Sequence, residues 1–150
     1  MAVLVDAGGA PFALWQPGAH QGFGLVAEAG APAWFELHAR EYATAVGFYE
    51  RALGWQTRVM SDGDDFRYTQ MVIDDEPYAG IMDSAGLLPE HVPANWQVYF
   101  GTPDVDAAVD TVTRLGGGVI QPAEDTPFGR IAAVSDPTGA VFRLVSAPAS

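Results

Sequence analysis

A carboxylate and an imidazole stand two positions apart, as Glu36 and His38, in the run WFELH. The run is apolar and is typical of a β-strand. Because side chains alternate between the two faces of a strand, Glu36 and His38 point to the same side as Trp34. Carboxylate oxygens and imidazole nitrogens are ligands that proteins offer to divalent metal ions. Two ligands do not make a metal site, although Glu41 is near in sequence.

Other interpretations of these side chains stay open. Glu36 can instead be the partner of an arginine such as Arg143, and His38 can be a strand-end residue that faces water. The remaining histidines, His20 and His91, fall in stretches without strand or helix pattern. They are expected to be exposed loop residues.

Composition excludes several kinds of chemistry. The chain of 150 residues has no cysteine, so disulfides, cysteine-ligated zinc and thiol nucleophiles are ruled out. Seven basic and nineteen acidic residues give a net charge of −12, which repels phosphate backbones and anionic lipid surfaces. We therefore expect neither a nucleic-acid nor a membrane partner. With no long apolar run, the sequence predicts a soluble, cytoplasmic protein.

The elements that must position these side chains occur in two similar stretches. Strand-like runs open at Trp34 and at Trp96, which are 62 positions apart (96 − 34). A Leu-Gly pair recurs with the same spacing, at 53–54 and 115–116. Apolar residues at helical spacing precede each pair and predict two helices that end at these glycines.

Short β-rich runs separated by turn residues follow each predicted helix. For the second helix, Thr102 is expected to be the N-cap and Pro103 the first helical residue. The order strand, helix and three strands therefore occurs twice, which predicts an α+β fold made of two βαβββ units. The predicted strands after the helices are 55–61, 66–74, 77–83, 118–123, 130–136 and 140–146.

The two ends of the chain carry a further repeat. The stretches AVLVDAGGAPFALW and AAVSDPTGAVFRLV align at an offset of 130 and share, among others, Asp6/Asp136 and Gly9/Gly139. Four segments are therefore expected, although residues 1–33 can also be a simple N-terminal extension. They are an orphan β-hairpin resembling the end of a preceding module (1–15), a linker (16–33), a module (34–146) and a tail (147–150).

The orphan hairpin leads to an expectation about assembly. A two-stranded hairpin is at best marginally stable alone in water. It must therefore dock on its own module or pair with a second copy of the chain. We expect the second arrangement, a homodimer, because an orphan strand edge exposes unpaired backbone groups.

The segments FYERALGW, PDVDAAV and DPTGAVFRLV resemble the vicinal oxygen chelate superfamily, which contains glyoxalase I, the bleomycin-resistance proteins and the extradiol dioxygenases. The resemblance covers about residues 34–146 and is that of the C-terminal module of a tandem-module member. It implies that the two βαβββ units form one open, U-shaped mixed sheet with helices packed on its convex face. The concave face then holds a small-molecule ligand.

The resemblance also bears on a metal ion. Metal-dependent members of the superfamily place His, Glu or Gln at four strand positions. The matching positions here are Trp34, Trp96, Gly80 or Met82, and Arg143, and none of them is a normal ligand. The guanidinium of Arg143 would put a fixed positive charge where the cation should lie. We predict no metal and no other cofactor, and expect a divalent metal only if the ligand positions have been replaced elsewhere.

What remains is a predicted cup with aromatic rings and a few polar groups. If Phe142 and Leu144 pack beneath the helices, strand alternation places Arg143 in the cup with two tryptophans. Such a cup suits a flat, partly apolar ligand with an anionic or carbonyl group, although the tryptophans can also be core residues. The predicted ligand-binding residues are Trp34, Glu36, His38, Tyr68, Gln70, Trp96, Arg130 and Arg143.

Two classes of function follow. The first is a metal-independent small-molecule-binding protein that sequesters a drug or metabolite. The second is a metalloenzyme of glyoxalase, hydroxylase or dioxygenase type with a non-standard or lost metal site. The unmatched ligand positions favour the first, and no catalytic residue is predicted.

Overall fold

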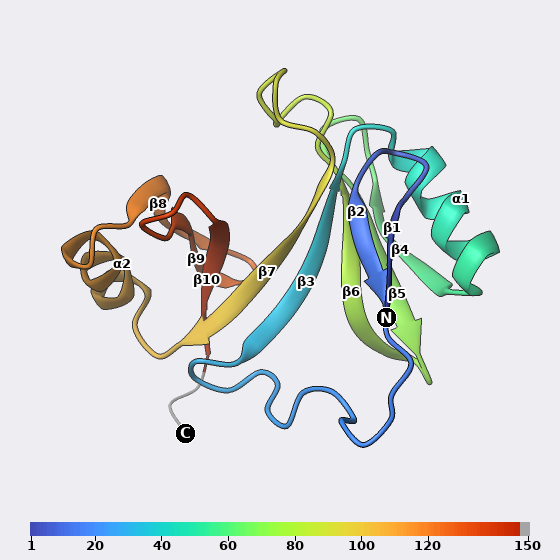
Figure 1. Cartoon of the computed structure of the whole chain (residues 1–150). Helices are drawn as coiled ribbons and strands as arrows, with labels where there is room; N and C mark the ends of the chain where they lie inside the picture. Colours follow the sequence, from blue (N-terminus) through green and yellow to red (C-terminus); the bar gives the residue numbers. More distant parts are fainter. Residues whose placement is uncertain (148–150) are drawn as a thin grey trace. The chain divides into compact units, whose positions relative to one another are not determined.

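The computed structural model describes residues 1–147, so the predicted tail at 147–150 lies outside the described residues except for Ala147. The described chain is mixed α+β, as the sequence predicts (Figure 1). Eight of its strands form one open mixed sheet, and β1 and β2 form a separate two-stranded sheet. None of the helices in the described part of the chain is long and apolar enough to cross a membrane.

The chain divides into two compact units, each with one helix. Residues 1–22 and 35–96 make up the first unit, and residues 23–34 and 97–147 are the described part of the second. The strands are β1 (Ala2–Val5), β2 (Pro11–Leu14), β3 (Pro32–Ala39), β4 (Gln56–Asp62), β5 (Arg67–Ile73), β6 (Glu76–Asp83), β7 (Asn95–Thr102), β8 (Gly118–Thr126), β9 (Gly129–Ser135) and β10 (Val141–Ser146). The helices are α1 (Tyr42–Leu53) and α2 (Val105–Arg114).

In the first unit the strand order is β4-β5-β6-β3, with β3 parallel to β6 and the other neighbours antiparallel. The helix α1 ends at Gly54, whose φ of 69° is in the left-handed region that glycine adopts without strain. Ala45 and Tyr49 of α1 pack against Leu37 and Ile81 of the sheet in one buried cluster. The face of the sheet that carries Leu37 therefore faces the helix.

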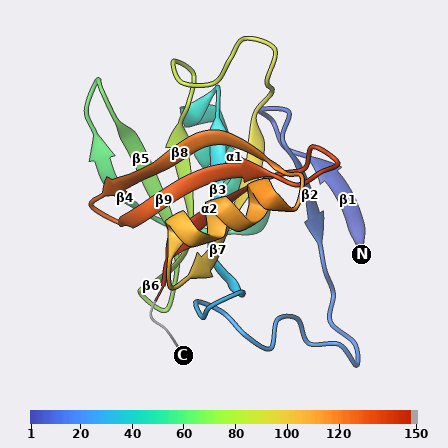
Figure 2. The same cartoon turned by 90° about the vertical axis from the view of Figure 1, so that its left-hand side faces the viewer.

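In the second unit the order is β7-β10-β9-β8, with β7 and β10 parallel. The helix α2 packs along β8, β9 and β10 (Figure 2). Its N-cap is Asp104, whose carboxylate accepts a hydrogen bond of 3.0 Å from the amide of Ala107. The expected start at Thr102 and Pro103 is therefore wrong, because Asp104 is an acidic N-cap that satisfies a free amide of the first turn. Leu144 and Phe142 pack beneath α2, as expected.

The hairpin β1–β2 repeats the turn of the hairpin β9–β10. The Oδ1 atom of Asp6 accepts hydrogen bonds from the amides of Gly8 and Ala10, and Oδ1 of Asp136 accepts them from Thr138 and Ala140. Gly9 and Gly139 both have a φ of 92°, which the turn requires of its glycine.

The hairpin β1–β2 is docked on its own chain, which is the alternative to the expected pairing with a second copy. The ring of Phe12 lies edge-on to Phe48 and Tyr49 of α1, with centroid distances of 6.0 and 5.6 Å. The hydroxyl of Tyr49 also donates a 2.9 Å hydrogen bond to Asp6. The hairpin is thus attached to the first unit through Phe12 and Asp6, whereas Val3 and Val5 of β1 stay exposed.

Candidate ligand-binding site

A buried polar cluster lies on the face of the first sheet that is turned away from α1. The Nε2 atom of His38 lies 3.0 Å from Oε1 of Glu36, and the hydroxyl of Tyr68 donates to Oε2 of Glu36 at 2.8 Å. Glu36, His38 and Tyr68 are 6%, 3% and 7% exposed. The interpretation of His38 as a residue facing water is therefore wrong, because the imidazole is buried against the carboxylate.

The cluster depends on a glycine in the neighbouring strand. Gly80 of β6 is paired with Glu36 of β3 and with Gln70 of β5. A Cβ atom at Gly80 would collide with the hydroxyl and ring of Tyr68. The missing side chain of Gly80 is what allows Tyr68 to lie over the strand and reach Glu36.

The hydrogen bonds constrain what this cluster can do. With Glu36 ionised, its oxygens only accept, so Nε2 of His38 carries the proton of their shared bond, and in the neutral imidazole Nδ1 is an acceptor. Tyr68 donates its one hydroxyl proton to Glu36 and keeps acceptor capacity. The cluster therefore has acceptor atoms for a ligand that donates a hydrogen bond.

The residues of this face do not fit the divalent metal that the superfamily implies. Both oxygens of Glu36 are engaged by side chains, and the phenol of Tyr68 fills the space above Gly80, where a ligating side chain would stand. Across residues 1–147, no group of three or more His, Cys, Asp or Glu side chains is placed to hold a metal ion.

Arg143 is the polar centre of the corresponding face of the second unit. Its guanidinium carbon lies 5.6 Å from the ring centroid of Tyr99, and Nη1 donates to the side-chain oxygen of Gln121 at 3.4 Å. Its Nε is buried and has no hydrogen-bond partner among the described residues. A buried donor without a partner costs free energy, so this N–H is suited to an acceptor on a ligand.

Two of the predicted ligand-binding residues lie elsewhere. Trp96 packs with the apolar cluster under α1, where its Nε1 donates to the hydroxyl of Tyr49 at 2.9 Å. Arg130 forms ion pairs with Asp106 of α2 at 2.7 Å and with Asp125 at 3.0 Å. Trp96 is therefore a residue of the helix-facing side, and Arg130 holds α2 rather than facing the side of Arg143.

The reason for the misplacement of Trp96 is a difference of one residue in register. The strands β3 and β7 begin at 32 and 95 and end at 39 and 102, so they correspond at an offset of 63 (95 − 32 and 102 − 39). The sequence similarity of Trp34 and Trp96 has an offset of 62. A shift of one residue moves a side chain to the opposite face of a sheet.

Two features of the structure were not predicted from the sequence, the hydrogen bonds of Arg40 and a cavity beside Trp55. Arg40 donates hydrogen bonds to the carbonyl of Val92, at 2.9 Å from Nε and 2.7 Å from Nη2, and so anchors the segment that precedes β7. A cavity with Trp55 and Tyr78 among its lining residues lies on the helix-facing side of the first unit. His20 and His91 are exposed, as expected.

The comparison with family models identifies the class of protein. The chain belongs to the Glyoxalase/Bleomycin resistance protein/Dioxygenase superfamily, whose family model matches residues 31–144. The resemblance seen in the sequence is thereby confirmed.

Two of the relatives carry names that refer to anthracycline biosynthesis. The chain is 37% identical over 151 residues to the anthracycline biosynthesis protein DauV of Streptomyces sp. (strain C5), covering 97% of this chain and 52% of DauV. It is 36% identical to the anthracycline biosynthesis protein DnrV of Streptomyces peucetius, covering 77% of this chain and 46% of DnrV. The chain thus spans about half the length of these relatives.

Solved structures share the fold at low sequence identity. Methylmalonyl-CoA epimerase of Streptomyces coelicolor, in complex with 2-nitronate-propionyl-CoA, superposes with a TM-score of 0.57 at 18% identity. The match covers 81% of this chain and 97% of the epimerase chain. At this identity the likeness concerns the fold alone.

Proposed function

We propose that this chain is a small-molecule-binding protein that works without a metal ion of its own and sequesters its ligand. The observation that carries the proposal is the buried Nε of Arg143, a charged donor without a partner among the described residues. A carbonyl or anionic group on a flat ligand is an acceptor for this N–H, and a charge-assisted hydrogen bond of this kind is among the strong ones.

The first unit supports the metal-independent part of the proposal. The Glu36, His38 and Tyr68 cluster is closed by its own hydrogen bonds. We propose that these residues, with Gln70 from the same face of the first unit's sheet, act on ligands through hydrogen bonding and packing. Trp34 falls in the second unit, and its role in ligand binding stays a prediction. A metalloenzyme would need a donor set that this face does not offer.

Ligand binding is tested first by calorimetry. Two relatives are named for anthracycline biosynthesis, so an anthracycline is a suitable first compound. Arg143→Glu is expected to weaken binding by about tenfold or more, because the charge-assisted hydrogen bond to a carbonyl of the compound is lost and an ionised glutamate has no proton to donate in its place. Arg114→Glu, at an exposed arginine in the last turn of α2, is the matched control for the change in charge.

Two results would contradict the proposal. Equal affinity of Arg143→Glu and the unchanged chain would remove Arg143 from the site. Elemental analysis of the purified protein that finds stoichiometric nickel, zinc, iron or manganese would favour the metalloenzyme instead.

We also propose that the chain forms a homodimer through the exposed edge of β1. Val3 and Val5 of this strand are 70% and 63% exposed, and an apolar strand edge favours pairing with another strand. Val3→Lys with Val5→Lys is expected to shift light scattering to the monomer mass. Val26→Lys, at an exposed loop valine, is the control, and a monomer of the unchanged chain would refute the proposal.

A cytoplasmic location of the protein stays a prediction.

A further inference from the structure

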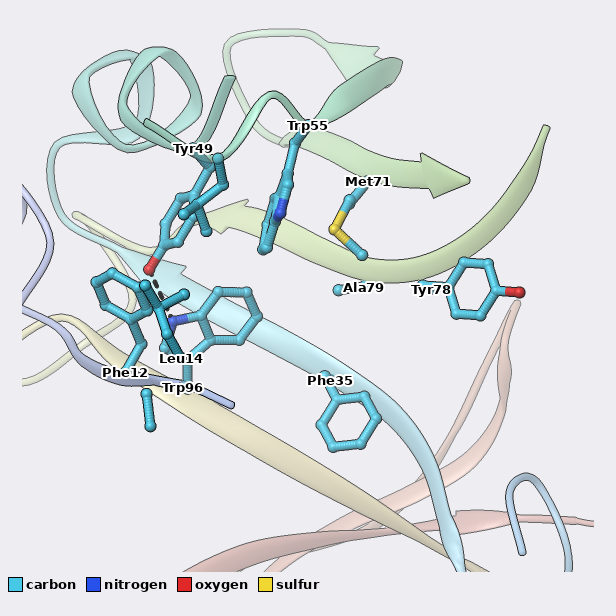
Figure 3. Close-up of a pocket in the computed structure, with 11 residues that line it drawn as sticks. Phe12, Leu14, Phe35, Tyr49, Trp55, Met71, Tyr78, Ala79 and Trp96 are labelled. Carbon is cyan, nitrogen blue, oxygen red and sulfur yellow. Dashed lines mark hydrogen bonds between the residues drawn. The ribbon is translucent and has the colours of Figure 1, made fainter. Parts of the chain in front are cut away.

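The first unit has a cavity of about 500 Å³ on its helix-facing side. Figure 3 shows Phe12 and Leu14 of β2 on one side of it, and Phe35 and Met71 from the sheet on another. Trp55, just after α1, and other residues of α1 and β6 complete the lining. The cavity is thus on the opposite face of the sheet from Glu36.

The aromatic end of the cavity is held in place by stacking and hydrogen bonds. Tyr49 and Trp55 are stacked at 4.5 Å with an angle of 20° between their rings. Trp96 lies edge-on to both, at 5.6 and 6.1 Å. The chain of hydrogen bonds from Trp96 to Tyr49 to Asp6, each of 2.9 Å, fixes the orientation of these rings. The aromatic wall is therefore preformed.

Tyr49, Trp55 and Trp96 pack with the buried cluster under α1, and the rest of their surface lines the cavity. The cavity is open to solvent and is not an interior void. Its volume of about 500 Å³ lies in the range of small-molecule pockets, which are mostly apolar and aromatic. Flat aromatic ligands stack on such walls and bury a large apolar area.

Charge indicates which aromatic ligands fit. A neighbouring depression shares Leu53, Trp55 and Met71 with the cavity and extends to Asp74. Asp74 is exposed in the turn between β5 and β6, and no arginine lines either pocket. The chain also carries a net charge of −12. The local and global fields both favour a cation over an anion.

We propose that this cavity is a second small-molecule site, which takes flat aromatic cations with the ring system against Trp55 and Trp96 and the positive charge toward Asp74. Cation–π attraction to the aromatic wall adds to the stacking. The site is independent of the function proposed above, because it uses neither Arg143 nor the cluster around Glu36.

The test compares two three-ring probes of opposite charge, 9-aminoacridine and anthracene-9-carboxylate. Binding is followed by calorimetry and by quenching of tryptophan fluorescence. We expect saturable binding of 9-aminoacridine and binding of the carboxylate that is weaker by about tenfold or more. Equal affinity of the two probes, or no saturable binding of 9-aminoacridine, would overturn the proposal.

Variants locate the probe. Ala13→Trp adds a ring at an exposed lining position without removing a contact, and is expected to abolish binding of 9-aminoacridine. Phe128→Trp, at an exposed residue outside the cavity, is the matched control and should bind as the unchanged chain does. Tyr78→Ala, at a half-exposed lining residue, gives a second disruption that does not touch the core and should weaken binding.

Three variants test the role of Asp74 and distinguish this cavity from the face that carries Arg143. Asp74→Asn should weaken binding of 9-aminoacridine several-fold, whereas Asp64→Asn, at another exposed aspartate, should not. Arg143→Glu should leave the affinity unchanged. Loss of binding in Arg143→Glu, or full binding in both Ala13→Trp and Tyr78→Ala, would show that the probe binds elsewhere and refute the proposal.

Discussion

The same strand position carries an acidic side chain in the first unit and an aromatic side chain beneath an arginine in the second. At the offset of 63 between β3 and β7, Glu36 of the first unit corresponds to Tyr99 of the second (99 − 36). Glu36 is the centre of an acidic cluster in which His38 and Tyr68 engage both carboxylate oxygens. Tyr99 instead lies beneath the guanidinium of Arg143.

The two clusters differ in whether their polar groups are already hydrogen-bonded within the protein. The oxygens of Glu36 have protein partners, whereas the Nε atom of Arg143 has none among the described residues. The hydrogen bonds around Glu36 join side chains of β3 and β5, so they also stabilise the first unit. The guanidinium of Arg143 donates a long hydrogen bond of 3.4 Å to Gln121, and its buried Nε has no partner among the described residues. Burial of such a donor costs free energy that a ligand acceptor can restore.

The largest losses of stability should come from substitutions in the two apolar cores. They test whether each unit depends equally on the side chains buried under its own helix. Leu37→Ala in the first unit and Leu144→Ala in the second should each lower the free energy of unfolding by about 2–5 kcal/mol. Both side chains are buried in the cluster under their own helix. Urea denaturation measures the effect, and an unaffected midpoint for Leu144→Ala would mean that the faces of β10 are reversed.

The next effect isolates the cluster of the first unit. Gly80→Ala should cost about 1–3 kcal/mol, because the new methyl group collides with Tyr68. The same change in a Tyr68→Ala background should cost much less, since the colliding ring is gone. Equal costs in the two backgrounds, measured by denaturation, would contradict the position of Tyr68.

The two similar hairpins allow a third test. Asp6→Ala should lower stability by about 1–3 kcal/mol, because the buried hydroxyl of Tyr49 and two turn amides lose their acceptor. Asp136→Ala removes the same turn bonds in an exposed hairpin and should cost less. A larger thermal shift for Asp136→Ala would show that docking of β1–β2 on α1 does not stabilise the chain.

Asp136 also predicts a pH dependence. Hydrogen bonds from the Thr138 hydroxyl and from the amides of Ala140 and Thr138 hold its pKa below the ordinary value of 3.8. Because the folded-state pKa is the lower one, the stabilisation is complete above the ordinary value and is lost as the pH falls through the folded-state pKa. Thermal melts of Asp136→Asn should therefore depend less on pH in this acid range, and an unchanged acid slope would contradict the turn geometry.

The smallest effect concerns Arg130 in the second unit. Its hydrogen bonds to Asp106 hold the pKa of that carboxyl below its usual range, but the side chains of Arg130 and Asp106 are 34% and 62% exposed. Arg130→Gln should lower the melting temperature slightly at low salt and not at high salt, where exposed ion pairs are screened. A loss that persists at high salt would indicate a packing role for the side chain.

Much of the local structure could be predicted from the sequence, because it depends on neighbours along the chain. Helical spacing and Gly54 define α1, which spans the predicted residues. The Asp-to-Gly pattern of the turns repeats at both ends, and the alternation in β10 correctly turns Phe142 and Leu144 toward α2. These features rest on period and turn chemistry, which a sequence carries directly.

Only the tertiary structure decided what the side chains meet. The burial of His38 depends on Glu36 and Tyr68, and Tyr68 reaches Glu36 only because strand pairing brings Gly80 beneath it. Trp96 lies on the opposite face from the predicted one, because the strands β3 and β7 correspond at an offset of 63 and the sequence repeat has an offset of 62. Long-range hydrogen bonds between strands set this register. Because side chains alternate between the two faces of a strand, a shift of one residue moves each side chain to the opposite face, although the sequence itself is unchanged.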